Sequence, residues 1–189
     1  DCIIENLTTD NILEIPLELE REGFASAVLR KLKLEDREAD LGKWEKAVYA
    51  AYKQEKERKV RIAVVGKYVE MHDAYVSLYE ALKYAGYDLC VDCETVGVSS
   101  DKINDRNAAQ KLAGYDGIII PAGFGERGFA GKIAAARYAR THDVPCLMIG
   151  LGAHAGAVEF ARDVLGIHTA DSREFDKKTS APVVCEGST

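Results

Sequence analysis

From residue 60 onward, apolar runs of strand length alternate with amphipathic stretches of helix length. Strands are expected at 60–65, 89–96, 117–121 and 144–149, and helices at 73–85, 104–112, 129–140 and 152–165. Because the expected strands are apolar along nearly their whole length, both faces of their sheet must be covered by helices. The sequence therefore predicts a three-layer αβα fold of class α/β with a mainly parallel sheet. Functional residues are then expected in the loops at the carboxyl ends of the strands.

The first 58 residues follow a different, helical pattern. Pro16 is placed to begin a short helix, and a second helical stretch is expected at 24–32. Apolar residues then recur near helical spacing at Leu41, Trp44, Val48, Ala51 and Tyr52. The charged run at 53–59 follows and is interpreted as an exposed helix end and a boundary. We therefore expect a helical linker at 1–58 and an α/β domain at 59–189.

Composition limits the partners and the compartment. The formal net charge of −6 argues against nucleic acid or an anionic membrane as the main partner, and no apolar run reaches the roughly 20 residues of a transmembrane helix. Of the five cysteines, Cys90 and Cys93 lie three apart on an expected strand and so point to opposite faces. Reduced, mostly buried thiols and a cytoplasmic location are expected. Because the chain begins with Asp1 and not Met, we expect it to be a piece of a longer product.

Residues 144–160 predict a strand, a sharp turn and a helix, on which many α/β enzymes carry a nucleophile. Here the residue at the turn is Gly150, which has no sulfur or oxygen to attack a substrate. Residues 123–128 match the glycine pattern of dinucleotide sites, but they follow the third strand instead of the first, which argues against that reading. Backbone amides at 123–124 and 150–151 are better candidates for donors to an oxyanion.

Several longer segments carry a more specific signal. They are 14–17, 65–70, 73–75, 80–82, 116–125, 127–128, 131–139, 159–162 and 174–176. Together they resemble the glutamine amidotransferase half of CTP synthases and its preceding linker, over residues 3 to 184. The resemblance implies a flavodoxin-like class I amidotransferase fold. It also implies glutamine hydrolysis at a cysteine in a G-x-C-x-G-x-Q elbow, with the ammonia passing to a synthetase domain that aminates UTP.

This chain departs from that pattern at its chemical centre. The elbow reads Met148-Ile-Gly150-Leu-Gly152-Ala-His154, so Gly150 stands where the resemblance implies the nucleophilic cysteine. His154 stands at the glutamine-binding Gln, and Ala122 replaces one glycine of a P-G-G-F-G loop. The catalytic His and Glu of the family would lie beyond residue 189. No intact catalytic residue is therefore expected, and the domain is interpreted as C-terminally incomplete.

The resemblance also implies substrate-binding positions and partners. The positions are Gly123, Phe124, Leu151, His154 and Glu174. No cofactor is expected in this chain, since ATP and magnesium would belong to the synthetase domain, and no metal site is expected. Cys146 is interpreted as a buried core residue and His154 as a half-exposed helix residue, not as catalytic groups. Lys67, Tyr68 and Tyr75 are candidates for a surface facing the synthetase domain, with a plain structural role as the alternative.

Three hypotheses follow. The first is a pseudoenzyme, a glutaminase module of a CTP synthase (a ligase of pyrimidine biosynthesis) that has lost activity and works with a synthetase domain or free ammonia. The second is a regulatory module that binds a glutamine-like small molecule or forms a homo-oligomer. The third is new chemistry at His154 or Glu174.

Overall fold

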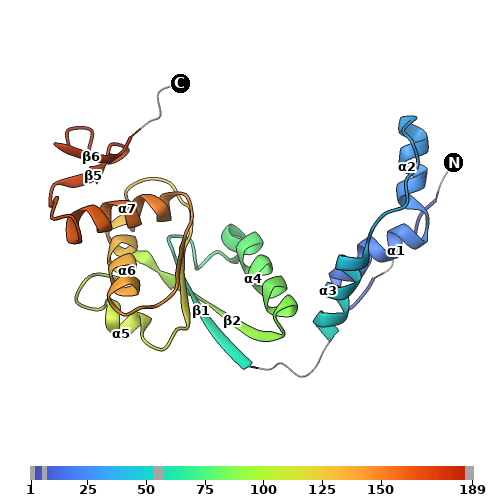
Figure 1. The fold of residues 1–189 in the computed structure, drawn as a ribbon, viewed down its shortest axis with the longest axis horizontal. Helices are drawn as coiled ribbons and strands as arrows, with labels where there is room; N and C mark the ends of the chain where they lie inside the picture. The colour runs from blue at the N-terminus through green and yellow to red at the C-terminus, as the bar shows by residue number, and fades with distance from the viewer. Residues whose placement is uncertain (1–2, 6–7, 53–57, 186–189) are drawn as a thin grey trace. The chain divides into compact units, whose positions relative to one another are not determined.

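The computed structural model describes residues 3–5, 8–52 and 58–185 (Figure 1). The chain divides into two compact units. The first comprises Asp1–Arg58 and Lys83–Asp92, and the second comprises Lys59–Leu82 and Cys93–Thr189. The expected boundary between linker and domain at residue 58 stays a prediction.

A four-stranded sheet forms the centre of the α/β fold, in the order β2-β1-β3-β4. The strands are β1 (Arg58–Gly66), β2 (Val91–Ser99), β3 (Gly117–Ile120) and β4 (Cys146–Met148). β3 runs parallel to both β1 and β4, with Ile62 opposite Gly117 and Ile118 opposite Cys146. The predicted α/β fold with a mainly parallel sheet is confirmed.

Helices flank this sheet and bury its apolar side chains. They are the 3₁₀ turns η2 (His72–Tyr75) and η3 (Ser100–Lys102) and the helices α4 (Val76–Asp88), α5 (Ala108–Leu112), α6 (Phe129–Thr141) and α7 (Leu151–Asp163). Ala63 and Val65 of β1 and Ile118 and Ile120 of β3 pack with the alanine-rich face of α6 in one core cluster. Since small side chains line that face, α6 can approach the sheet closely.

Two helices begin later than the sequence predicts. The stretch predicted as helix from residue 104 becomes helical only at Ala108, because Asn104 and Asn107 hold a turn: the Asn104 amide donates to Asn107 Oδ1 at 2.8 Å, and the Arg106 amide to Asn104 Oδ1 at 3.0 Å. Asparagine side chains compete with a helix for backbone amides in this way. The stretch from residue 73 starts as η2 and becomes α-helical only at Val76.

The end of the described chain forms a second, two-stranded parallel sheet of β5 (Ala170–Ser172) and β6 (Ala181–Val184). Residues 181–184 thus pair with β5 of the same chain, and residues 186–189 lie outside the described residues.

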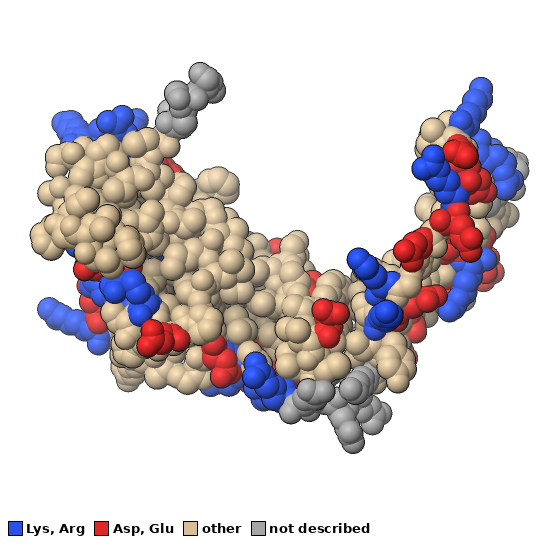
Figure 2. Space-filling model, in the orientation of Figure 1, with Lys and Arg blue, Asp and Glu red and all other residues tan. Residues whose placement is uncertain are grey.

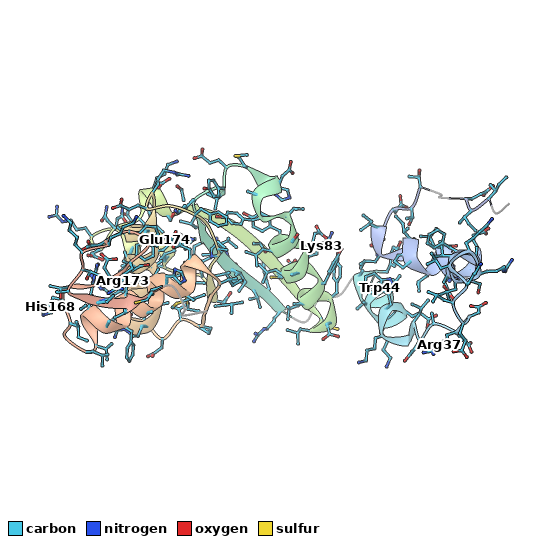
Figure 3. The ribbon with its side chains drawn as sticks, turned by 90° about the horizontal axis from the view of Figure 1, so that it is seen from above. Arg37, Trp44, Lys83, His168, Arg173 and Glu174 are labelled. Carbon is cyan, nitrogen blue, oxygen red and sulfur yellow. The ribbon has the colours of Figure 1, made fainter. Side chains whose placement is uncertain are left out.

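The first unit is helical, as predicted for its sequence. It contains η1 (Ile12–Glu14), α1 (Ile15–Arg21), α2 (Phe24–Leu32) and α3 (Gly42–Tyr52), and Pro16 lies in the first turn of α1. Its core is small: Leu13, Leu17 and Val48 are buried, with Leu41, Ala51, Tyr84 and Tyr87 packed against them. Trp44, labelled in Figure 3, donates its indole N–H to the Leu13 carbonyl at 2.7 Å.

Charged side chains are distributed differently on the two units. Acidic and basic residues lie close together along the helices of the first unit, whereas the face of the α/β unit seen in Figure 2 is mostly uncharged. Of the predicted charged boundary, residues 53–57 lie outside the described residues, and Arg58 and Lys59 begin β1. Among the described residues, no helix combines the length and apolar character needed to cross a membrane.

Candidate functional site

The predicted sharp turn between β4 and α7 is present at Gly150. Its backbone has φ 55° and ψ −117°, a combination that residues with a β-carbon rarely adopt. The turn is held on both sides: the Ile149 amide donates to the Ile120 carbonyl at 2.9 Å, and the amide of Ala153 donates to the Gly150 carbonyl at 2.9 Å. The elbow geometry is therefore intact, although its residue carries no reactive atom.

Two backbone amides beside this turn are free to bind an acceptor. Within the described part of the chain, neither the Leu151 amide, at the start of α7, nor the Gly123 amide donates a hydrogen bond. The first amides of a helix have no partner inside the helix and favour a negative charge. The Leu151 side chain, by contrast, is buried in a core with Phe129 and Phe175. Leu151 can therefore contribute its amide but not its side chain.

Two lysines form hydrogen bonds with the loop of residues 121–125 that follows β3. The ammonium of Lys132, on α6, donates to the carbonyls of Pro121 and Ala122. The ammonium of Lys67, after β1, donates to the Phe124 carbonyl at 2.6 Å and also to the Gly125 carbonyl. The backbone carbonyls of the loop point toward the two lysines, and these hydrogen bonds fix its orientation. The sequence left two roles open for Lys67, a surface facing a synthetase domain or a plain structural role, and its burial fits the structural role.

Burial has a clear electrostatic effect on both lysines. Burial, and to a smaller extent the nearby charge of Lys67, lowers the pKa of Lys132 to about 8. The pKa of Lys67 is also lowered, first by burial and then by Arg127. Sequence reasoning missed the role of Lys132; the signal was a lone charge within a run of small and apolar residues on α6.

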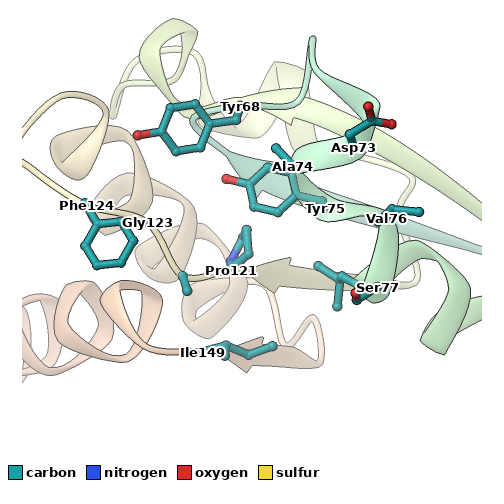
Figure 4. A pocket seen from close by; sticks show the side chains of 12 residues that line it. Tyr68, Asp73, Ala74, Tyr75, Val76, Ser77, Pro121, Gly123, Phe124 and Ile149 are labelled. Atoms are coloured by element: carbon teal, nitrogen blue, oxygen red, sulfur yellow. The ribbon is translucent and has the colours of Figure 1, made fainter.

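A pocket of about 330 Å³ opens beside this loop (Figure 4). Its walls come from η2 and the start of α4 on one side and from the loop after β3 on the other. The aromatic rings of Tyr68, Tyr75 and Phe124 line it, with Asp73 and Ser77 as polar groups. The Tyr75 hydroxyl accepts a hydrogen bond from the Lys67 amide at 3.1 Å, and burial raises the pKa of Tyr75. Pockets of this size and character suit small molecules.

A comparison with known families decides what this arrangement represents. Residues 70–186 match the family model described as glutamine amidotransferase class-I. The chain belongs to this family.

The relatives of this amidotransferase place it more narrowly. It is 41% identical over 184 residues to the CTP synthase of Caldanaerobacter subterraneus subsp. tengcongensis, covering 97% of this chain and 34% of the relative. It is 45% identical over 183 residues to the CTP synthase of Chloroflexus aurantiacus, covering 97% of this chain and 33% of the relative. The chain thus spans about a third of the length of these relatives and is an amidotransferase domain of the kind found in CTP synthases.

A solved structure agrees with this assignment. The glutaminase domain of Trypanosoma brucei CTP synthase, determined with bound acivicin, superimposes with a TM-score of 0.61 at 36% sequence identity. The match covers 65% of this chain and 48% of that one. The α/β fold of the amidotransferase therefore rests on both sequence and structure.

The structure divides the five predicted substrate-binding residues of this amidotransferase among three places. Gly123 and Phe124 line the pocket, while Leu151 lies in the core. His154, in the first turn of α7, and Glu174, after β5, face each other with Nδ1 and Oε2 3.7 Å apart. Both side chains are half-exposed, as predicted for His154. The binding roles of all five residues stay predictions.

The cysteines of the amidotransferase offer no replacement nucleophile among the described residues. Cys146 on β4 is half-buried, less than predicted, and burial raises its thiol pKa to about 11, so it is protonated at neutral pH. Cys90 and Cys93 are also half-buried and Cys185 is exposed, which corrects the expectation of mostly buried thiols. Cys2 lies outside the described residues. The described residues contain no cluster of three or more metal-ligating side chains.

Proposed function

We propose that this chain is the amidotransferase domain of a CTP synthase and that it does not hydrolyse glutamine. The observation that carries the proposal is Gly150 at the turn between β4 and α7. In the family reading, the attack on the glutamine amide comes from a thiolate at this position. Without a nucleophile, covalent catalysis loses several orders of magnitude in rate.

The surroundings of Gly150 support this proposal. Outside the elbow itself, only Ala122 has atoms within 4 Å of the position that a β-carbon on residue 150 would occupy. No described thiol or hydroxyl therefore takes the place of the missing cysteine. The free amides of Gly123 and Leu151 and the pair of His154 and Glu174 remain, so the domain keeps groups that can hold an amide without cleaving it.

The proposal also names the partner and the nitrogen source. In relatives about three times as long, a domain like this one occurs within a CTP synthase. We propose a synthetase domain as the partner, with ATP and magnesium bound there, UTP as the substrate and free ammonia as the source of nitrogen. A cytoplasmic location fits these soluble substrates.

The test is the release of glutamate from glutamine by the purified chain. We expect no release above the rate without protein, whereas the CTP synthase of Chloroflexus aurantiacus, assayed in parallel, releases glutamate. In an assembly with a synthetase domain, we expect CTP to form from ammonium chloride but not from glutamine. Glutamate release at the rate of the intact relative would refute the proposal.

The pocket beside the loop supports a second candidate function, the binding of a small molecule without chemistry. It has the volume of a ligand site and combines three aromatic rings with a carboxylate and a hydroxyl. Titration calorimetry with glutamine and related amides tests this function, and a substitution of Phe124 by Ala should weaken any binding that it reports. If none of the compounds binds, this second function is removed.

A further inference from the structure

The loop after β3 and the elbow before α7 meet at Ala122 and Gly150. A β-carbon built on Gly150 would lie 3.1 Å from the Ala122 β-carbon and 3.5 Å from its α-carbon. Carbon atoms that are not bonded to each other attract best at about 3.5–4.0 Å and repel steeply below that range. The methyl group of Ala122 therefore occupies space that any side chain at position 150 would need.

The loop has little freedom to move away from this contact. The buried ammonium of Lys132 holds the carbonyls of Pro121 and Ala122 itself, and that of Lys67 holds the carbonyls of Phe124 and Gly125. A shift of Ala122 would stretch hydrogen bonds to charged groups, and the one from Lys132 to the Pro121 carbonyl is buried and therefore costly to leave unmade. The ring of Pro121 further restricts the backbone at the start of the loop.

We propose that the methyl group of Ala122 opposes a β-carbon at position 150, so that a side chain restored there by one substitution destabilises the elbow. The inference rests on the proposed loss of glutaminase activity and adds a second residue to its cause. The reactive atom is absent, and the β-carbon that would carry it meets a tight contact with Ala122. Replacement of Ala122 by Gly is the change that reopens the space.

Two separate effects oppose a side chain at position 150, and they can be distinguished. The first is the backbone strain of φ 55°, which any residue with a β-carbon meets whatever stands at position 122. The second is the contact with the Ala122 methyl group, which disappears when residue 122 is glycine. A double-mutant cycle isolates the second effect because the first cancels.

The experiment compares the thermal unfolding of four chains: wild type, Gly150→Ala, Ala122→Gly and the double variant. We expect Gly150→Ala to lower the melting temperature by at least about 3 °C more in the wild-type background than in the Ala122→Gly background. The same cycle is repeated with Gly150→Cys. If Gly150→Ala does not fold in buffer, all chains are compared in sucrose, which strengthens the folded state of each.

A matched control distinguishes a specific coupling between positions 122 and 150 from a general destabilisation by Ala122→Gly. Gly166 has φ 72°, and nothing lies within 4 Å of a β-carbon built there, so Gly166→Ala tests left-handed strain without a contact. We expect Gly166→Ala and Ala122→Gly to lower the melting temperature additively. Equal losses from Gly150→Ala in both backgrounds, or no recovery of folding by Ala122→Gly, would overturn the inference. No glutamine is involved, so this outcome is distinct from a failure of the proposed function.

Discussion

At the scale of single residues, Lys132 is the most unusual group in the α/β unit. Its side chain is fully buried, and within the described part of the chain it forms hydrogen bonds only with backbone carbonyls and no ion pair with a carboxylate. A buried cation without a counter-charge is unfavourable, and this is why burial lowers the pKa of Lys132 to about 8. The orientation of the 121–125 loop is therefore maintained against an electrostatic cost.

This cost predicts how stability depends on pH. Between about pH 8 and the ordinary lysine pKa of 10.5, the unfolded chain binds more protons at Lys132 than the folded chain does. The free energy of unfolding should therefore rise, by about 1 kcal/mol from pH 8 to pH 9. Urea unfolding at a series of pH values measures this rise, and Lys132→Met should remove most of it.

Cys146 limits the pH range over which the free energy of unfolding rises. Its thiol pKa is raised from 9.0 to about 11 in the folded chain, so from about pH 9 the unfolded state loses this proton first, and the resulting loss of stability offsets the further rise due to Lys132. Lys102→Met, which removes an exposed lysine paired with Glu70, is the control and should leave the rise between pH 8 and pH 9 unchanged. A rise that persists in Lys132→Met would show that another group causes it.

At the scale of elements, glycines let helices approach other backbone segments closely. A β-carbon on Gly152, in the first turn of α7, would lie 1.9 Å from the Ile120 carbonyl oxygen at the end of β3. A β-carbon on Gly131 of α6 would lie 1.8 Å from the carbonyl oxygen of Ser100. These contacts are with backbone atoms, so no side chain can rotate away to relieve them.

We therefore predict that Gly152→Ala destabilises the chain severely. Overpacking in a core typically costs about 1–3 kcal/mol, and a contact this short with a strand should cost at least the upper value. Denaturant unfolding monitored by circular dichroism measures the loss. Gly166→Ala, at a glycine with open space around it, should cost much less, and equal losses for the two variants would contradict the argument.

The sequence predicts an element well when neighbouring residues determine it, and poorly when contacts between distant residues do. The order of strands and helices from residue 60 and the turn at Gly150 follow from apolar periodicity and glycine placement, and both are confirmed. The late start of α5 depends on the side chains of Asn104 and Asn107, and the pairing of β5 with β6 joins short segments with weak patterns. Such features require three-dimensional contacts that periodicity does not contain.

The candidate site was predictable to a similar extent. The strand ends that carry Gly123 and Gly150 were predicted from the fold class, and the glycine at position 150, where the resemblance implies a cysteine, is visible in the sequence. The buried positions of Lys67, Lys132 and Leu151 were not, because lysine is rarely buried and a resemblance gives a residue's position but not its exposure. The short distance between Ala122 and a β-carbon placed at position 150 follows only from the three-dimensional structure.

At the scale of the whole molecule, the two compact units differ in the size of their cores. Among the described residues, the core of the first unit contains three buried apolar residues, whereas one cluster of the second contains a dozen. Burial of apolar surface is the main source of stability, so the smaller core should open more easily. We predict faster amide hydrogen exchange in α1 and α3 than in β3 and α6, measured by mass spectrometry. Equal protection in both would contradict this prediction.

Trp44 makes this difference directly observable. It is the single tryptophan of the chain, and it lies in the helical unit with its indole N–H on the Leu13 carbonyl. Fluorescence excited at the red edge of its absorption therefore reports on that unit alone, while the far-ultraviolet dichroism reports on every helix of both. The protein thus carries an intrinsic optical probe, and two non-coincident denaturation curves from one sample would reveal sequential melting without any label.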